Sequence, residues 1–292
     1  MTTTSRVSAT TAATTAVAVS ALAIVSISSW ITLFRRTTKE PRIVSLCPST
    51  TDTLYDLGLA RYVVGRTRYC PKPPNGDDKR DTPAPPKVGG TKDPQWDRIR
   101  ALKPTHILFN LEENDHTHRS TAESICPTLV HTPTTIVESM DMIFDLGQVF
   151  QVDHEAQRIV HDIQTSLDQL RQQQQHPKQT FTFLYVIWHH PDAMVAGRGT
   201  YIDSLLSAAG GVNVATQIND QRYPLLPKNE LDVQADFCLL STEPYPFKES
   251  HLPLYQKYGS NCRIIDGEML SWHGSRSAAG LRYLMDYFDE TK

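Results

Sequence analysis

Residues 103–114 read KPTHILFNLEEN, and residues 234–244 read QADFCLLSTEP. Each stretch places a Pro or a small residue before a short apolar run and a Glu after it. Glu112 and Glu243 occupy the same position in the two stretches. A short, continuously apolar run between turn residues is typical of a parallel strand that is buried on both faces. The repetition therefore predicts two similar α/β lobes, each with a strand that ends in an acidic loop.

The segments around the repeat alternate between short apolar runs and amphipathic stretches, which predicts parallel βαβ units. From Asp153 to about residue 174 the apolar residues keep helical spacing on one face. A helix of that length is on the order of 30 Å long, enough to brace two lobes. We therefore predict an N-terminal lobe over residues 41–150, a linker helix within 151–178 and a C-terminal lobe over 179–292. Ligands of open α/β sheets bind at the carboxyl ends of strands, so the acidic loops should line a cleft between the lobes.

The first 40 residues have a different composition from the rest. The stretch from Thr14 to Phe34 is uncharged, rich in apolar and small residues, and long enough to span a hydrocarbon core. Arg35, Arg36 and Lys39 follow it, and by the positive-inside rule they would stay cytoplasmic. We predict a signal or membrane-anchor segment here, and the sequence leaves open which of the two it is.

The composition excludes several classes of function. The charge is nearly balanced at −3 and there is no basic run, so nothing indicates nucleic-acid binding. The five cysteines are scattered, with no CxxC pair and no metal-ligand spacing. The chain contains no GxSxG, P-loop, GxGxxG or HExxH motif, so no enzyme class is indicated.

Several histidines and tryptophans are expected near the mouth of the cleft. His189 and His190 directly follow a predicted strand, and either could join His273 and Glu243 in a zinc or manganese site. Histidines that only pack or face solvent are the alternative. Trp272 lies in a Ser/Gly/His loop, a setting typical of a binding-cleft wall.

Five motifs, in order, resemble substrate-binding proteins of the cobalamin and iron-siderophore ABC importers. Residues 41–52 (PRIVSLCPSTTD) and 88–94 (VGGTKDP) are similar to the general family. Residues 112–114 (EEN), 241–249 (STEPYPFKE) and 266–272 (DGEMLSW) resemble its helical-backbone metal receptor branch. His273 stands where the branch commonly has Tyr, so the ligand is not carried over from the branch.

The resemblance covers residues 41–288 and implies a class III periplasmic-binding-protein-like fold, which consists of two Rossmann-like lobes joined by a single long helix. It implies limited hinge motion and a ligand held between the lobes. It also implies that one acidic residue on each lobe docks against the membrane permease. The matching positions are Asp97 and Glu230.

The combined prediction is a monomeric, non-enzymatic binding protein outside the cytoplasmic membrane. It would deliver a metal chelate to an ABC importer, with cobalamin as the first expected ligand and a ferric siderophore as the second. A receptor for a bare metal ion is the alternative, followed by a metal-dependent enzyme on the same scaffold. The residues expected to contact the ligand are Ser49, Thr50, Tyr69, Glu112, Glu113, Trp188, Arg198, Glu243, Trp272 and Arg276. Arg276 could instead serve only to cap its loop.

Overall fold

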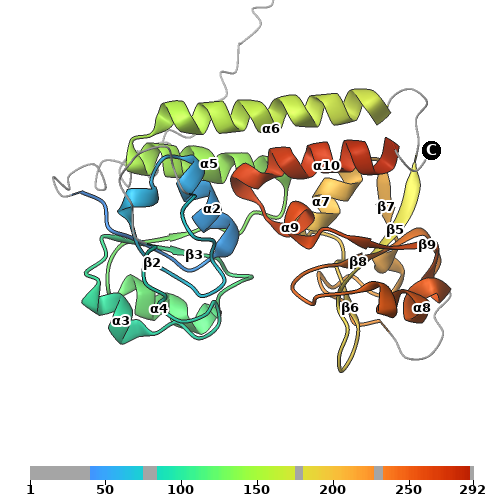
Figure 1. The fold of residues 1–292 in the computed structure, drawn as a ribbon, viewed down its shortest axis with the longest axis horizontal. Coiled ribbons are helices and arrows are strands. Elements are labelled where there is room, and N and C mark those ends of the chain that lie inside the picture. Colours follow the sequence, from blue (N-terminus) through green and yellow to red (C-terminus); the bar gives the residue numbers. More distant parts are fainter. Residues whose placement is uncertain (1–39, 75–83, 175–179, 227–232, 290–292) are drawn as a thin grey trace, which may run out of the picture. The chain divides into compact units, whose positions relative to one another are not determined.

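The structure, a computed structural model, shows two α/β lobes within one compact unit, Lys39–Lys292 (Figure 1). The described residues are 40–74, 84–174, 180–226 and 233–289. The predicted signal or anchor segment and Glu230 lie outside the described residues. Among the described residues, no helix is both long enough and apolar enough to cross a membrane.

The N-terminal lobe is built on a four-stranded parallel sheet in the order β2-β1-β3-β4. Its strands are β1 (Ile43–Ser45), β2 (Val63–Arg66), β3 (His106–Phe109) and β4 (Thr128–Val130). Its helices are α2 (Pro48–Asp56), α3 (Trp96–Ala101) and α4 (Arg119–Glu123), with 3₁₀ turns η1 (Ala60–Tyr62) and η2 (His116–His118). The apolar residues of β1 and β3 are buried on both faces of the sheet, as the continuous apolar runs predicted.

The C-terminal lobe contains a five-stranded sheet in which β6-β5-β8-β9 are neighbours and β7 also pairs with β5. The strands are β5 (Phe181–Trp188), β6 (Met194–Val195), β7 (Gly211–Asn213), β8 (Ala235–Ser241) and β9 (Gly259–Ile265). Among the strands in the described residues of this lobe, only β6 is antiparallel to its neighbour in the sheet. The helices are α7 (Tyr201–Ala208), α8 (Leu252–Tyr255), α9 (Gly267–Ser271) and α10 (Ser277–Asp289), with 3₁₀ turns η3 (Val214–Gln217), η4 (Glu249–His251), η5 (Gln256–Tyr258) and η6 (Gly274–Arg276).

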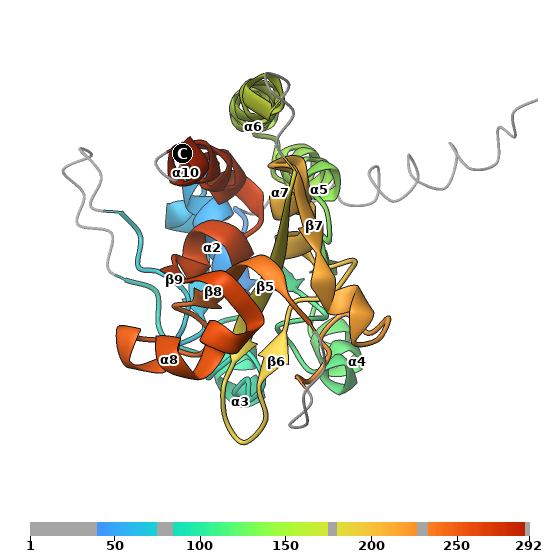
Figure 2. The ribbon, with the colours of Figure 1, turned by 90° about the vertical axis from the view of Figure 1, so that its right-hand side faces the viewer.

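One long helix, α6 (Asp153–Gln174), extends across both lobes (Figures 1 and 2). Helix α5 (Ile136–Phe150) leads into α6, which packs on α5 and α10. The sharp turn between α5 and α6 brings Gly147 so close to Ala156 that a Cβ on Gly147 would lie 2.6 Å from the Cβ of Ala156. A small residue is therefore needed where the two helices cross.

The largest hydrophobic core is continuous from one lobe to the other. It runs from Leu54 in α2 through Ile143 in α5 and Ile163 in α6 to Tyr185 in β5 and Leu284 in α10. Close-packed cores of this kind resist continuous deformation. The lobes therefore share a rigid base, which favours small relative movements of the strand-end loops over wide opening.

The α/β fold class, both repeated strands and the long linker helix are confirmed. The last strand is longer than its apolar run at residues 264–265 would indicate, because β9 begins at Gly259. Ser260, Asn261 and Arg263 precede its final apolar residues, and this polar composition hid the strand. Such a composition is compatible with a strand at the edge of the sheet, where one side faces solvent.

Candidate ligand-binding site at the lobe junction

The acidic loop after β3 is held in a defined turn by two asparagines. The Asn110 side-chain oxygen accepts hydrogen bonds from the backbone N–H of Glu112 at 2.8 Å and of Glu113 at 3.0 Å. Asn114 accepts from the Asn110 backbone N–H and donates to the Leu46 carbonyl. Glu112 and Glu113 therefore project from a backbone whose conformation these hydrogen bonds fix. The local sequence does not predict this turn.

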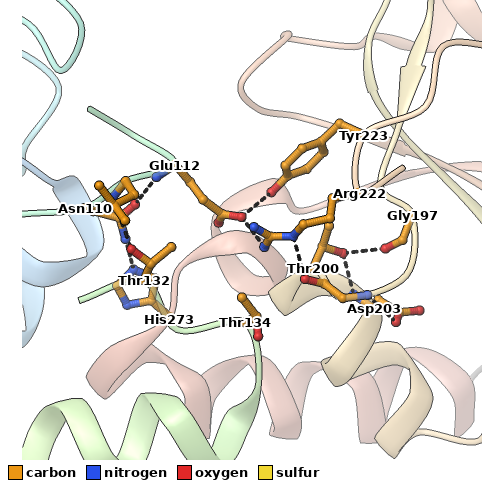
Figure 3. A network of polar contacts seen from close by, with 12 residues as sticks. Asn110, Glu112, Thr132, Thr134, Gly197, Thr200, Asp203, Arg222, Tyr223 and His273 are labelled. Carbon is orange, nitrogen blue, oxygen red and sulfur yellow. Dashed lines mark hydrogen bonds and ion pairs between the residues drawn. The ribbon is translucent and has the colours of Figure 1, made fainter. Parts of the chain in front are cut away.

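His273, from the C-terminal lobe, is buried in the N-terminal lobe beside this loop (Figure 3). Its Nε2 lies 3.0 Å from Ser49 Oγ and 3.2 Å from Asn110 Nδ2. Because Asn110 Oδ1 accepts from two backbone N–H groups, its Nδ2 must be the donor to His273 Nε2. The proton of a neutral His273 therefore sits on Nδ1, which is buried without a hydrogen-bond partner in the described part of the chain. Burial, with a smaller contribution from His131, lowers the pKa of His273 to about 3.

Ser49 and Thr50 lie in the first turn of α2 and are almost completely buried, at 5% and 3% exposure. Ser49 contacts His273 and the Cys47 thiol. Both residues were predicted to orient the ligand, and the structure places them beneath the junction surface. The contact of Ser49 with His273 indicates a role in joining the lobes.

Arg276 also joins the lobes. Its guanidinium contacts Asp52 in α2 through Nε at 3.0 Å and Nη2 at 2.9 Å, and Glu268 in α9 through Nη1 at 3.1 Å. It also covers the ring of Trp272 at 4.6 Å. Burial raises the pKa of Asp52, and the Arg276 charge opposes that shift. Of the two roles considered for Arg276, the structural one agrees better with these contacts.

Trp272 and Glu243 form a unit within the C-terminal lobe. The Trp272 indole Nε1 donates to Glu243 Oε1 at 2.5 Å, and Ser271 Oγ donates to the same oxygen at 2.9 Å. Burial raises the pKa of Glu243, while these two hydrogen bonds lower it. Glu243 therefore fixes the orientation of the half-buried Trp272 ring.

Other predicted contact residues remain accessible. Tyr69 is 58% exposed and Trp188 is 39% exposed, with its indole Nε1 donating to the His190 carbonyl at 2.6 Å. Arg198 and Glu113 are exposed as well. Although the Glu113 residue as a whole is exposed, partial desolvation raises the pKa of its carboxyl group, and Lys92 counteracts this shift.

Glu112 contacts the C-terminal lobe directly. Its carboxylate forms an ion pair with Arg222 and accepts a hydrogen bond from the Tyr223 hydroxyl at 3.1 Å (Figure 3). Arg222 and Tyr223 were not predicted as site residues. They lie between η3 and β8, far from any repeated motif, so the local sequence gives no signal for the contact.

The histidines predicted to form a site for a bare metal ion do not lie close together. His189 Nδ1 lies 2.8 Å from the Tyr255 hydroxyl, and its ring packs among Tyr245, Phe247 and His251. His190 is exposed, and His273 points into the other lobe. The described residues include no group of three or more His, Cys, Asp or Glu side chains arranged to hold a metal ion. The prediction of a bare-ion site built from these histidines and Glu243 is therefore wrong for this structure.

Residues 43–252 match the family model described as "Periplasmic binding protein". The chain belongs to the periplasmic binding protein family. No curated protein matches it.

The binding protein is also similar in fold to several solved structures. One is a periplasmic heme-binding protein from Roseiflexus sp. RS-1, with a TM-score of 0.71, 19% identity, and coverage of 87% of this chain and 100% of that one. Another is the periplasmic vitamin B12 binding protein of Vibrio cholerae, with a TM-score of 0.70, 19% identity, and coverage of 86% and 97%. A third is an ABC transporter substrate-binding protein from Listeria monocytogenes EGD-e, with a TM-score of 0.67, 21% identity, and coverage of 84% and 97%.

These relationships establish the fold as that of the two-lobed, class III periplasmic binding proteins of ABC importers. Family membership implies that the binding protein works outside the cytoplasm. Asp97 lies on α3 with its carboxylate fully exposed, 3.3 Å from Arg100. An exposed position is what permease docking requires, and docking by Asp97 and Glu230 stays a prediction.

Proposed function

We propose that this binding protein captures a metal chelate between its lobes and delivers it to an ABC importer permease. One observation carries the proposal: the segments that follow β1 and β3 of the N-terminal sheet contact the C-terminal lobe at a single junction. There Glu112, which follows β3, contacts Arg222 and Tyr223 of the other lobe. Ligands of open α/β sheets bind at such strand ends.

The side chains around the junction suit a flat, partly apolar ligand. Trp188 and Tyr69 are exposed at strand ends, and Trp272 is held by Glu243 with one face covered by Arg276. Pockets for organic ligands combine aromatic walls with a few orienting polar groups. The names of two similar structures mention heme and vitamin B12, both of which are metal macrocycles. A metal macrocycle is therefore our first ligand class, followed by a ferric siderophore.

The test is a fluorescence titration of the full chain with cobalamin, iron(III) protoporphyrin IX and a ferric siderophore. We expect saturable quenching by at least one chelate, and a smaller quench when Trp188 or Trp272 is replaced by Phe. Trp96→Phe is the matched control, because Trp96 lies on α3 against His118. No saturable response to any chelate would refute the proposed function.

A further inference from the structure

Two polar side chains of the C-terminal lobe converge on a single carboxylate of the N-terminal lobe. Arg222 forms an ion pair with the Oε1 atom of Glu112, and the Tyr223 hydroxyl donates to the same atom (Figure 3). The Arg222 side chain is 40% exposed and that of Glu112 is 24% exposed. The pair therefore lies at the border between the lobes and solvent, while the Arg222 Nη2 atom itself is buried behind the surface and makes an ion pair but no hydrogen bond among the described residues.

Arg222 is positioned by its backbone before any ligand arrives. The segment that contains it pairs with the segment after β6, because the Gly197 N–H donates to the Arg222 carbonyl at 2.7 Å. Arg222 Nε donates to the Gly199 carbonyl at 2.8 Å, which leaves the outer guanidinium nitrogens directed at the other lobe. A Cβ on Gly197 would lie 2.4 Å from the Gln221 carbonyl oxygen, so the two segments are in close contact.

The chemistry of this pair is that of a carboxylate receptor. A guanidinium binds planar carboxylates with good geometry, and charge-assisted hydrogen bonds are stronger than neutral ones. Burial raises the pKa of Tyr223, and the Glu112 charge raises it further, so the phenol stays protonated and donates. Arg198, on the paired segment, is exposed and adds positive charge nearby.

Two other cations at the junction already have partners. Arg276 is held by Asp52 and Glu268, and Lys92 donates to the Glu112 carbonyl oxygen at 2.7 Å. Lys92 is therefore a nearby cation toward which the Glu112 side chain can turn if it leaves Arg222.

We propose that Arg222 and Tyr223 form the anion site of the binding protein. Glu112 occupies this site while no ligand is bound. The ligand is a metal chelate that bears a carboxylate, and this carboxylate displaces Glu112. The inference rests on the proposed function and deepens it by naming the charge of the ligand. Exchange of one carboxylate for another leaves the guanidinium paired throughout. A neutral chelate that displaced Glu112 would leave Arg222 without a counter-charge, which is unfavourable at a partly buried position.

The experiment compares two probes with the same macrocycle, iron(III) protoporphyrin IX, which carries two propionates, and its dimethyl ester, in which methyl groups remove both negative charges. Full-length wild type and the variants Arg222→Gln, Tyr223→Phe and Glu112→Gln are titrated with each probe. Arg222→Gln should weaken binding of the diacid about tenfold or more. Glu112→Gln should strengthen it about two- to fivefold, because the competing carboxylate is gone. Binding of the ester should change little in either variant.

Tyr223→Phe removes a single hydroxyl and should weaken binding of the diacid alone, which guards against misfolding as the explanation. Arg282→Gln is the control, because Arg282 pairs with Asp162 between α10 and α6.

If the Glu112–Arg222 ion pair only holds the lobes together, Arg222→Gln and Glu112→Gln will shift the affinity in the same direction for both probes, and the inference is overturned. If wild type binds the ester as well as the diacid, the inference fails while the proposed function stands. If neither these probes nor cobalamin nor a ferric siderophore binds, both fail.

Discussion

Replacement of Gly274 by Ala should destabilise the contact that holds the two lobes together. Gly274 begins η6 with a φ of +86°, a left-handed conformation that disfavours side chains. Its N–H donates to Ser139 Oγ at 2.6 Å, and the next N–H, of Ser275, donates to Thr53 Oγ1 at 3.1 Å. A Cβ on Gly274 would lie 2.0 Å from Thr53 Oγ1 and 3.3 Å from the Met142 terminal methyl group.

The magnitude follows from two contributions. The left-handed conformation costs a non-glycine residue about 1–2 kcal/mol, and forcing a methyl group into a filled contact costs about 1–3 kcal/mol. The free energy of unfolding of Gly274→Ala should therefore fall by about 2–5 kcal/mol. For a unit of this size the melting temperature should drop by about 4–20 °C, since each kcal/mol corresponds to about 2–4 °C.

The assay is thermal unfolding followed by circular dichroism, with Gly58→Ala as the matched control. Gly58 has a φ of +75° and no atom within 4 Å of an added Cβ, so only the conformational contribution applies. The double variant with Thr53→Ala should recover part of the loss, because the nearest clashing atom is removed. Equal destabilisation by Gly274→Ala and Gly58→Ala would refute the argument that η6 is tightly docked on α2.

Two further predictions concern the same interface. Because the pKa of His273 is lowered to about 3, the unfolded chain binds a proton that the folded protein does not, and stability is lost as pH falls from about 6.5 toward 3. His273→Gln should remove about 2–3 kcal/mol of the loss between pH 6.5 and 4.5 in urea unfolding, and an unchanged pH dependence would contradict the buried neutral ring. Arg276→Met should destabilise by about 1–3 kcal/mol by leaving the half-buried Asp52 unpaired. Arg119→Met, which breaks the surface pair with Glu123, should stay within about 0.5 kcal/mol, and similar values for both would argue against a structural role for Arg276.

The sequence could predict the elements whose signal is local. Helix α6 was visible because its buried face repeats at helical spacing, and β3 and β8 were visible because each is a short apolar run between turn residues. Glu112 and Glu243 closely follow those strands in the sequence. Because parallel strands end at the same edge of a sheet, the sequence also predicted that each residue lies at that edge of its own sheet. Strands β4 and β7, three residues each, were missed because such short segments have no distinct periodicity.

What those side chains contact depended on the tertiary structure. Glu112 and Glu243 occupy the same position in the repeat, yet Glu112 contacts Arg222 of the other lobe and Glu243 holds Trp272 within its own. Asn110 and His273 are 163 positions apart in the chain, yet Asn110 Nδ2 lies 3.2 Å from His273 Nε2 in the fold. The sequence by itself determined the two lobes, the helix between them and the strand ends where a ligand can bind, because local periodicity encodes which residues are buried. Only the tertiary structure decided which cations stay available to a ligand and which histidine is buried, because pairing across the lobes depends on distances that no local pattern contains.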